Sequence, residues 1–125
     1  MQITWLYTGD DNEAHFATLD VPVTDDGHGA SFTEFLPTEG ISFREIKVRN
    51  ELEFRPAARR QALILTAGTF EIETGDGTRR TFGPGDVLLL DDTEGHGHII
   101  RRKEAGRTAV VRIPKSVDVA QWRVS

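Results

Sequence analysis

Residues 59–102, RRQALILTAGTFEIETGDGTRRTFGPGDVLLLDDTEGHGHIIRR, decide the fold of this chain. Two segments within this stretch, residues 61–66 and 86–90, are typical of strands. Both are apolar on their two faces, which favours strands that are covered on both sides. Between them, Gly-Asp-Gly at residues 75–77 is typical of a hairpin turn, and residues 83–86 form a second turn. The stretch therefore predicts short strands joined by tight turns.

The rest of the chain continues this pattern. Residues 1–7, 13–23, 41–48 and 108–113 have strand character, and a single helical turn is expected at residues 117–122. No long segment has apolar residues at the spacing of a helix. About nine short strands without helical intervals favour a sandwich or barrel, and a double-sheet jelly roll removes most unpaired strand edges. We therefore expect one all-β jelly-roll domain over all 125 residues, with little helix.

Composition excludes several classes of function. The chain carries a formal net charge of −5 and no cysteine. Mild acidity does not provide the basic field that nucleic acid requires, and without cysteine there is no disulfide framework or cysteine metal site. No apolar run approaches the roughly 20 residues of a membrane-spanning helix, and residues 1–16 lack the features of a signal peptide. We expect a soluble cytoplasmic protein with no nucleic-acid partner and no membrane partner.

Four features, in order along the chain, resemble the two motifs of the cupin superfamily. Gln61 stands where the first motif has a glutamate, and Gly68 follows at the motif's spacing of seven residues. The Pro-Gly-Asp turn at residues 84–86 and the Gly-x-x-His run from Gly95 to His98 resemble the second motif. The resemblance implies a double-stranded β-helix barrel.

The motif-bearing core of this resemblance covers about residues 41–113. A subgroup of small bacterial cupins of unassigned function is similar in further places, including Leu-Tyr-Thr-Gly at residues 6–9. The chain departs from the first motif at its two histidine positions, which fall within residues 54–57 (Phe-Arg-Pro-Ala). The subgroup commonly has a histidine where this chain has Arg55, and Thr93 stands at the proline position of the second motif.

By this resemblance, the strand that begins at His98 lines a pocket, with Ile100 and Arg102 on the same face and Gln61 opposite. A histidine titrates near neutrality and can act as general acid or base. Either Glu45 or Asp92 would orient it. We expect catalysis to use His98, Gln61, His96 and Glu45, and an anionic ligand to be bound by Arg59, Arg55, Arg102 and His15.

A metal is the alternative. Two histidines separated by one residue lie on one side of a regular strand, which is a ligand spacing and also what any alternating strand produces. The ligands of a single divalent transition metal (Fe, Mn, Ni or Zn) would be His98, His96 and Gln61. Asp91 and Asp92 resemble a loop-capping pair more than a catalytic pair, because adjacent strand residues point apart.

Three functions stay open from the sequence. The first is an enzyme of isomerase, cyclase or lyase type that acts on a small carboxylate or carbonyl compound by non-redox chemistry. The second is a metal-dependent cupin oxygenase or lyase, and the third is a ligand-binding module without catalysis. For a homodimer, which is common among cupins, the strands within residues 1–23 would supply an interface through Ile3, Trp5 and Tyr7.

Overall fold

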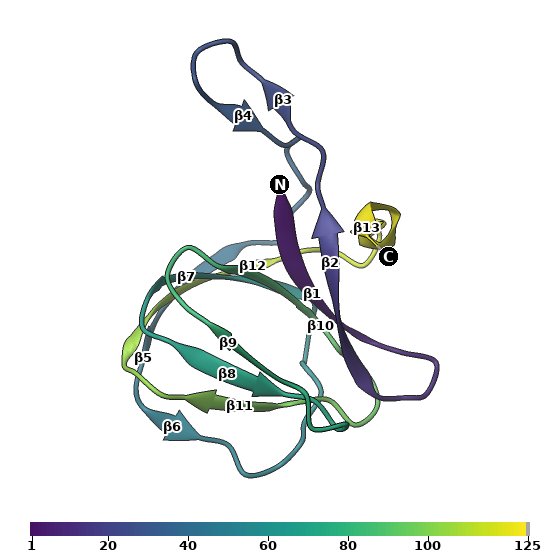
Figure 1. Ribbon diagram of the computed structural model, residues 1–125, viewed down its shortest axis with the longest axis vertical. Helices are drawn as coiled ribbons and strands as arrows, with labels where there is room; N and C mark the ends of the chain where they lie inside the picture. Colours follow the sequence, from purple (N-terminus) through teal and green to yellow (C-terminus); the bar gives the residue numbers. More distant parts are fainter. Residues whose placement is uncertain (125) are drawn as a thin grey trace.

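Eight strands of the chain divide between two sheets in the strand order of a jelly roll (Figure 1). They are β5 (Ile41–Ile46), β6 (Arg49–Asn50), β7 (Gln61–Ala67), β8 (Phe70–Glu73), β9 (Arg79–Phe82), β10 (Val87–Asp91), β11 (Ile99–Arg102) and β12 (Gly106–Arg112). In the computed structural model, which describes residues 1–124, the larger sheet contains the order β5-β12-β7-β10 and the smaller sheet the order β6-β11-β8-β9. The expected all-β fold is confirmed.

A buried apolar cluster joins the two sheets. Leu63 and Leu65 of β7 belong to the same cluster as Phe70 and Ile72 of β8 and Leu88 of β10. These side chains alternate along their strands, because successive residues of a strand point to opposite faces. The positions between them, such as Ala62 in β7 and Leu89 in β10, belong to a second cluster on the outer face of the larger sheet. Both strands are thus buried on two sides at these positions, as their sequences predict. Ile64 of β7 is an exception, because its side chain is exposed on the outer face.

The two N-terminal strands extend the larger sheet. β1 (Gln2–Thr8) runs parallel to β10, and β2 (Ala14–Asp20) and β13 (Arg123–Val124) follow it outward. Ile3, Trp5 and Tyr7 share one face of β1, and this face belongs to the second cluster. That cluster includes Val119 of the 3₁₀ turn η1 (Val119–Trp122). Trp5 is buried in this cluster, whereas Ile3 and Tyr7 are half-buried against it, and their place at a subunit interface stays a prediction.

A third, two-stranded sheet stands apart from the other two. β3 (Thr24–Asp25) and β4 (Ser31–Phe32) form a hairpin that projects beyond the body of the molecule (Figure 1). We call residues 24–35 the arm. Within residues 1–124, no helix is long and apolar enough to cross a membrane.

Candidate functional site

A cavity of about 130 Å³ lies between the two sheets. Its wall is mostly apolar, and its polar groups include His98, Gln61, Arg102 and Arg44. A largely apolar pocket with a few convergent polar groups is the usual form of a small-molecule site. The volume lies below the roughly 300–1,000 Å³ of sites for drug-sized ligands, which limits an enclosed ligand to a small molecule.

A buried histidine–aspartate pair stands at this cavity. His98 Nδ1 lies 2.6 Å from Asp92 Oδ2, and the two side chains are 9% and 0% exposed. Burial raises the pKa of Asp92, and the hydrogen bond and charge of His98 oppose this shift without cancelling it. Because Nδ1 contacts Asp92, Nε2 is the ring nitrogen that remains for a ligand. Of the two carboxylates considered for orienting this histidine, Asp92 is the one in contact.

The backbone around Gly97 shapes the loop that carries this pair. Gly97 has a φ of 76°, and a Cβ at this position would collide with the backbone of Arg55. Arg55 and His98 exchange two backbone hydrogen bonds of 3.0 Å, and Ala57 N donates to Asp92 O at 2.9 Å. Glycine is needed here because the φ is positive and the neighbouring chain leaves no room for a side chain.

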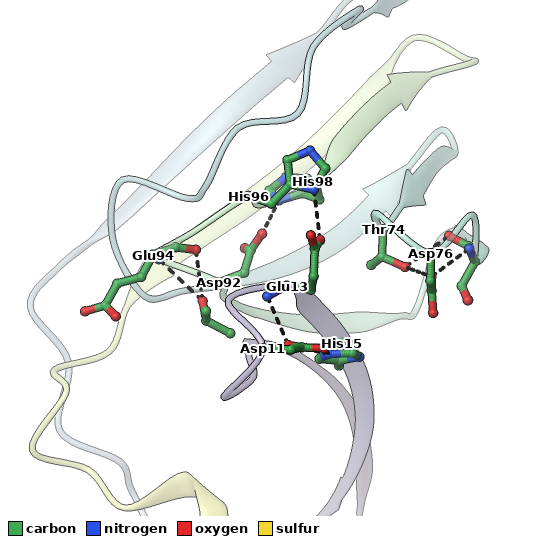
Figure 2. A network of polar contacts seen from close by, with 11 residues as sticks. Asp11, Glu13, His15, Thr74, Asp76, Asp92, Glu94, His96 and His98 are labelled. Atoms are coloured by element: carbon green, nitrogen blue, oxygen red, sulfur yellow. Dashed lines mark hydrogen bonds and ion pairs between the residues drawn. The ribbon is translucent and has the colours of Figure 1, made fainter.

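The turn between β1 and β2 holds the same loop from another side (Figure 2). His96 N donates to Asn12 O at 3.1 Å, and His96 Nδ1 lies 2.8 Å from Glu13 Oε2. His15 Nε2 lies 2.8 Å from Asp11 Oδ2. The pKa of Asp11 is lowered, mainly by the hydrogen bond from the Glu13 backbone amide and next by the hydrogen bond with His15. Neither histidine lines the cavity. The structure brings His98 and Gln61 together and places His96 and His15 in this supporting network.

Two arginines line the cavity, one from each sheet. Arg102 extends from β11 and Arg44 from β5. Burial lowers the pKa of Arg102, and the charges of Arg49 and Arg44 lower it further while Glu51 raises it. Sequence reasoning did not select Arg44 as a site residue. Its signal is the alternation of β5, which places Arg44 on the same face as Ile46, a residue that also lines the cavity.

The remaining candidates lie outside this cavity. The Arg55 side chain is 71% exposed and contacts Glu53, although it borders an adjoining depression together with His98 and Arg102. Arg59 borders a different hollow. Glu45 is exposed and pairs with Arg107 of β12 in the strand register.

The donor set does not fit a resident metal. Of the expected ligands, His98 and Gln61 line the cavity but His96 does not, and no group of three or more His, Cys, Asp or Glu side chains within residues 1–124 is placed to hold an ion. A catalytic zinc or iron site needs about three protein ligands. We therefore derive no chemical step through a metal.

No protein-family model matches this chain, and a search of curated proteins gave no match. The chemistry of the cavity has to indicate the function. The wall offers one histidine oriented by a carboxylate, one amide and two guanidinium groups, and it also includes the carboxylate of Glu104 and the hydroxyls of Thr69 and Thr108. Such a set can bind a small anion and move a proton on it.

Proposed function

We propose that this chain is a cupin-type enzyme that performs non-redox acid–base chemistry, of isomerase, cyclase or lyase type, on a small carboxylate or carbonyl compound. The observation that carries the proposal is the contact of 2.6 Å between His98 Nδ1 and Asp92 Oδ2 beside a cavity that also contains Arg102. A jelly roll by itself implies no activity, so the proposal depends on these side chains.

Asp92 acts by orienting the imidazole. Its carboxylate accepts a hydrogen bond from Nδ1–H, which leaves the lone pair of His98 on Nε2. Nε2 takes a proton from a carbon next to the carbonyl of the ligand. Returning the proton to a different carbon gives an isomerisation, and expelling a leaving group from the neighbouring carbon gives an elimination. Neither route changes the number of electrons of the substrate.

Arg102 and Arg44 select an anionic ligand. A guanidinium binds a carboxylate through two parallel hydrogen bonds and stays charged at all working pH values. Within residues 1–124, neither side chain has an ion-pair partner within 4 Å. Gln61 adds an amide N–H that donates to a carbonyl oxygen on which negative charge develops.

Hydrogen–deuterium exchange tests this proposal without knowledge of the substrate. Small 2-oxo, 3-oxo and 2-hydroxy carboxylates, each with its neutral amide, are incubated with the protein in D₂O and followed by proton NMR. We expect exchange next to the carbonyl in a carboxylate but not in its amide. His98→Ala should slow this exchange by at least about 100-fold. His28→Ala, in an exposed loop, is the matched control and should retain the wild-type rate.

Asp92→Asn separates orientation from folding. A positioning role predicts a lower rate and an altered pH profile, with the KM of the carboxylate nearly unchanged. Equal rates in wild type and His98→Ala would overturn the proposal. Melting-temperature shifts without any exchange would also overturn it, in favour of a binding module. Exchange that is lost on chelation and restored by a metal would support the metal-dependent alternative instead.

A further inference from the structure

A second hollow, of about 290 Å³, lies at one end of the larger sheet and is distinct from the cavity between the sheets. Its wall comes from the residues before β7 and from the end of β12, together with Thr93 after β10 and Glu39 before β5. The volume is near the lower end of the roughly 300–1,000 Å³ of small-molecule sites. Four cationic side chains line the hollow: Arg59, Arg60, Arg112 and Lys115.

Arg60 is the fixed part of this wall. Its side chain is only 9% exposed. Its Nη1 donates hydrogen bonds to Pro114 O at 3.2 Å and to Val117 O at 2.7 Å, which ties the segment after β12 to the start of β7. Its Nε is buried and has no hydrogen-bond partner in the described part of the chain. A guanidinium held in this way is ordered before a ligand arrives, so binding does not have to immobilise it.

The charges around the hollow do not balance. Asp91 Oδ1 lies 3.0 Å from Arg60 Nε and 2.7 Å from Lys115 Nζ, so one carboxylate faces two cations. Arg59 and Arg112 have no ion-pair partner within 4 Å among residues 1–124. The wall itself adds one more carboxylate. Four cations and two carboxylates leave a charge of +2 around the hollow.

The strand register brings the two unpaired arginines to the same place. β12 pairs with β7 so that Arg112 lies opposite Gln61, and Arg59 precedes Gln61 by two residues. The hydrogen bond from Ile113 N to Arg60 O, of 3.3 Å, continues the contact of the two segments beyond the strands. Residues that are far apart in the sequence therefore present their guanidinium groups to one hollow.

This positive charge stands out in an acidic chain. The net charge is −5, and the arm contains three acidic residues and no lysine or arginine. A hollow that is lined by one sign of charge raises the local concentration of the opposite ion. Guanidinium groups match phosphate oxygens through paired N–H donors, and an ammonium group such as that of Lys115 adds a point charge.

We propose that this hollow binds a phosphate group as its dianion, either as inorganic phosphate or as the monoester of a small molecule. The charge of +2 matches a dianion better than the single charge of a carboxylate. Arg59 and Arg112 contact the phosphate oxygens, and Arg60 and Lys115 supply positive charge that is already in place. None of these four residues lines the cavity, so the site is separate from that of the proposed acid–base function.

Titration of the nitrogen-15-labelled protein with inorganic phosphate tests the proposal. Proton–nitrogen correlation spectra are recorded at about pH 8, where phosphate is mainly a dianion, and at constant ionic strength. The backbone amide signals of Arg59, Arg60, Arg112 and Lys115 should shift and saturate. Acetate, with one charge, should bind at least about 10-fold more weakly. Methyl phosphate distinguishes the two sources, because binding at least as tight as that of phosphate indicates a monoester, and weaker binding indicates inorganic phosphate.

Variants locate the bound phosphate. Arg59→Gln and Arg112→Gln should each weaken phosphate binding by at least about 10-fold, because each removes a charged hydrogen-bond donor. Both residues are exposed, so the spectra of the variants should remain those of a folded protein. Arg107→Gln is the matched control, because Arg107 is exposed on the same strand but at its other end, and this variant should retain the wild-type affinity.

Three outcomes would overturn the proposal. The first is a set of signals that move with phosphate without saturating, or that move unchanged when Arg59 and Arg112 are both replaced by glutamine. The second is acetate binding as tight as phosphate binding. The third is loss of the shifts in Arg102→Gln, which would place the phosphate in the cavity instead. Each of these is independent of whether the protein catalyses exchange.

Discussion

Asp91 and Asp92 are neighbours in the chain, yet their carboxylates belong to different parts of the molecule. Asp91 accepts hydrogen bonds from Trp5 Nε1 at 3.0 Å and Lys115 Nζ at 2.7 Å, and its Oδ1 lies 3.0 Å from Arg60 Nε. Asp92 contacts His98 at the cavity between the sheets. Adjacent residues of an extended chain point apart, so one aspartate anchors the C-terminal segment and the other serves the candidate site.

Asp92→Asn should change how stability depends on pH. Burial raises the pKa of Asp92 above the ordinary 3.8, so the folded chain holds this proton to a higher pH than the unfolded chain does. The stabilisation from protonation is present below the unfolded pKa and is lost as the pH rises through the folded pKa. Asparagine cannot ionise. The free energy of unfolding of the variant, relative to wild type, should therefore increase between about pH 4 and pH 7.

Urea unfolding at several pH values in this range measures the relative free energy. The Oδ1 atom of Asp92 is buried with no hydrogen-bond partner within residues 1–124. The Asp92→Asn change therefore removes no hydrogen bond at this atom. A relative free energy that falls as the pH rises would show that ionised Asp92 stabilises the fold, contrary to this account.

Asp91→Asn should have the opposite pH dependence. Burial raises the pKa of Asp91, but Arg60, Lys115 and Trp5 outweigh it and hold the pKa below 3.8. The stabilisation is therefore present above pH 3.8 and is lost as the pH falls through the lower folded pKa. At neutral pH the change leaves Arg60 buried without its counter-charge, at a cost of about 3 kcal/mol.

Urea unfolding also measures this deficit. It should begin to shrink below about pH 4, where Asp91 is protonated in the unfolded chain, and should vanish only below the lower pKa of folded Asp91. Asp118→Asn is the control, because the Asp118 side chain makes no cap hydrogen bond to η1. A deficit that stays constant into acid would mean that the charge of Asp91 contributes nothing.

The alternation of apolar residues made much of this fold predictable. It separates Leu63 and Leu65 from Ala62 in β7 and places them on opposite faces, as the structure has them. Alternation fails for the histidine pair, because Gly95 and Gly97 both have positive φ values, of 71° and 76°. His96 therefore contacts Glu13 while His98 faces the cavity, and no count of residues reveals this.

Contacts between distant segments were also beyond the sequence. We expected Glu45 among the catalytic residues and interpreted Asp92 as loop-capping, yet Asp92 is the carboxylate that contacts His98. The choice depends on the path of the loop over residues 92–98. Arg44 reaches the cavity only because β5 lies beside β12 at the sheet edge. Such placements follow from tertiary packing, which a single sequence does not encode as a local pattern.

Truncation of core leucines tests the two clusters separately. Leu65 is 3% exposed in the cluster between the sheets, and Leu89 is 1% exposed in the outer cluster. Leu65→Ala and Leu89→Ala should each cost about 2–5 kcal/mol in the free energy of unfolding, because each leaves a cavity. Leu52→Ala, at an exposed position, should stay within about 0.5 kcal/mol of wild type. Chemical unfolding measures all three; a loss below about 1 kcal/mol in either cluster would mean that the site collapses around the smaller side chain.

Gly68 and Gly77 allow the cost of crowding to be separated from the cost of backbone conformation. Both have positive φ values, 82° and 86°. A Cβ on Gly68 would lie 2.7 Å from Ala105 O and 2.8 Å from Gly106 Cα, whereas a Cβ on Gly77 would meet no atom within 4 Å. Gly77→Ala should therefore lower the free energy of unfolding only by the conformational cost of a positive φ, about 1–2 kcal/mol. Gly68→Ala should lower the free energy of unfolding by this amount and by a further cost of crowding. The atoms that the new Cβ meets are backbone atoms and cannot move aside without disturbing β12. The difference between the two variants in chemical unfolding measures the crowding alone, and equal losses would show that the approach of β7 to β12 at Gly68 is looser than the structure has it.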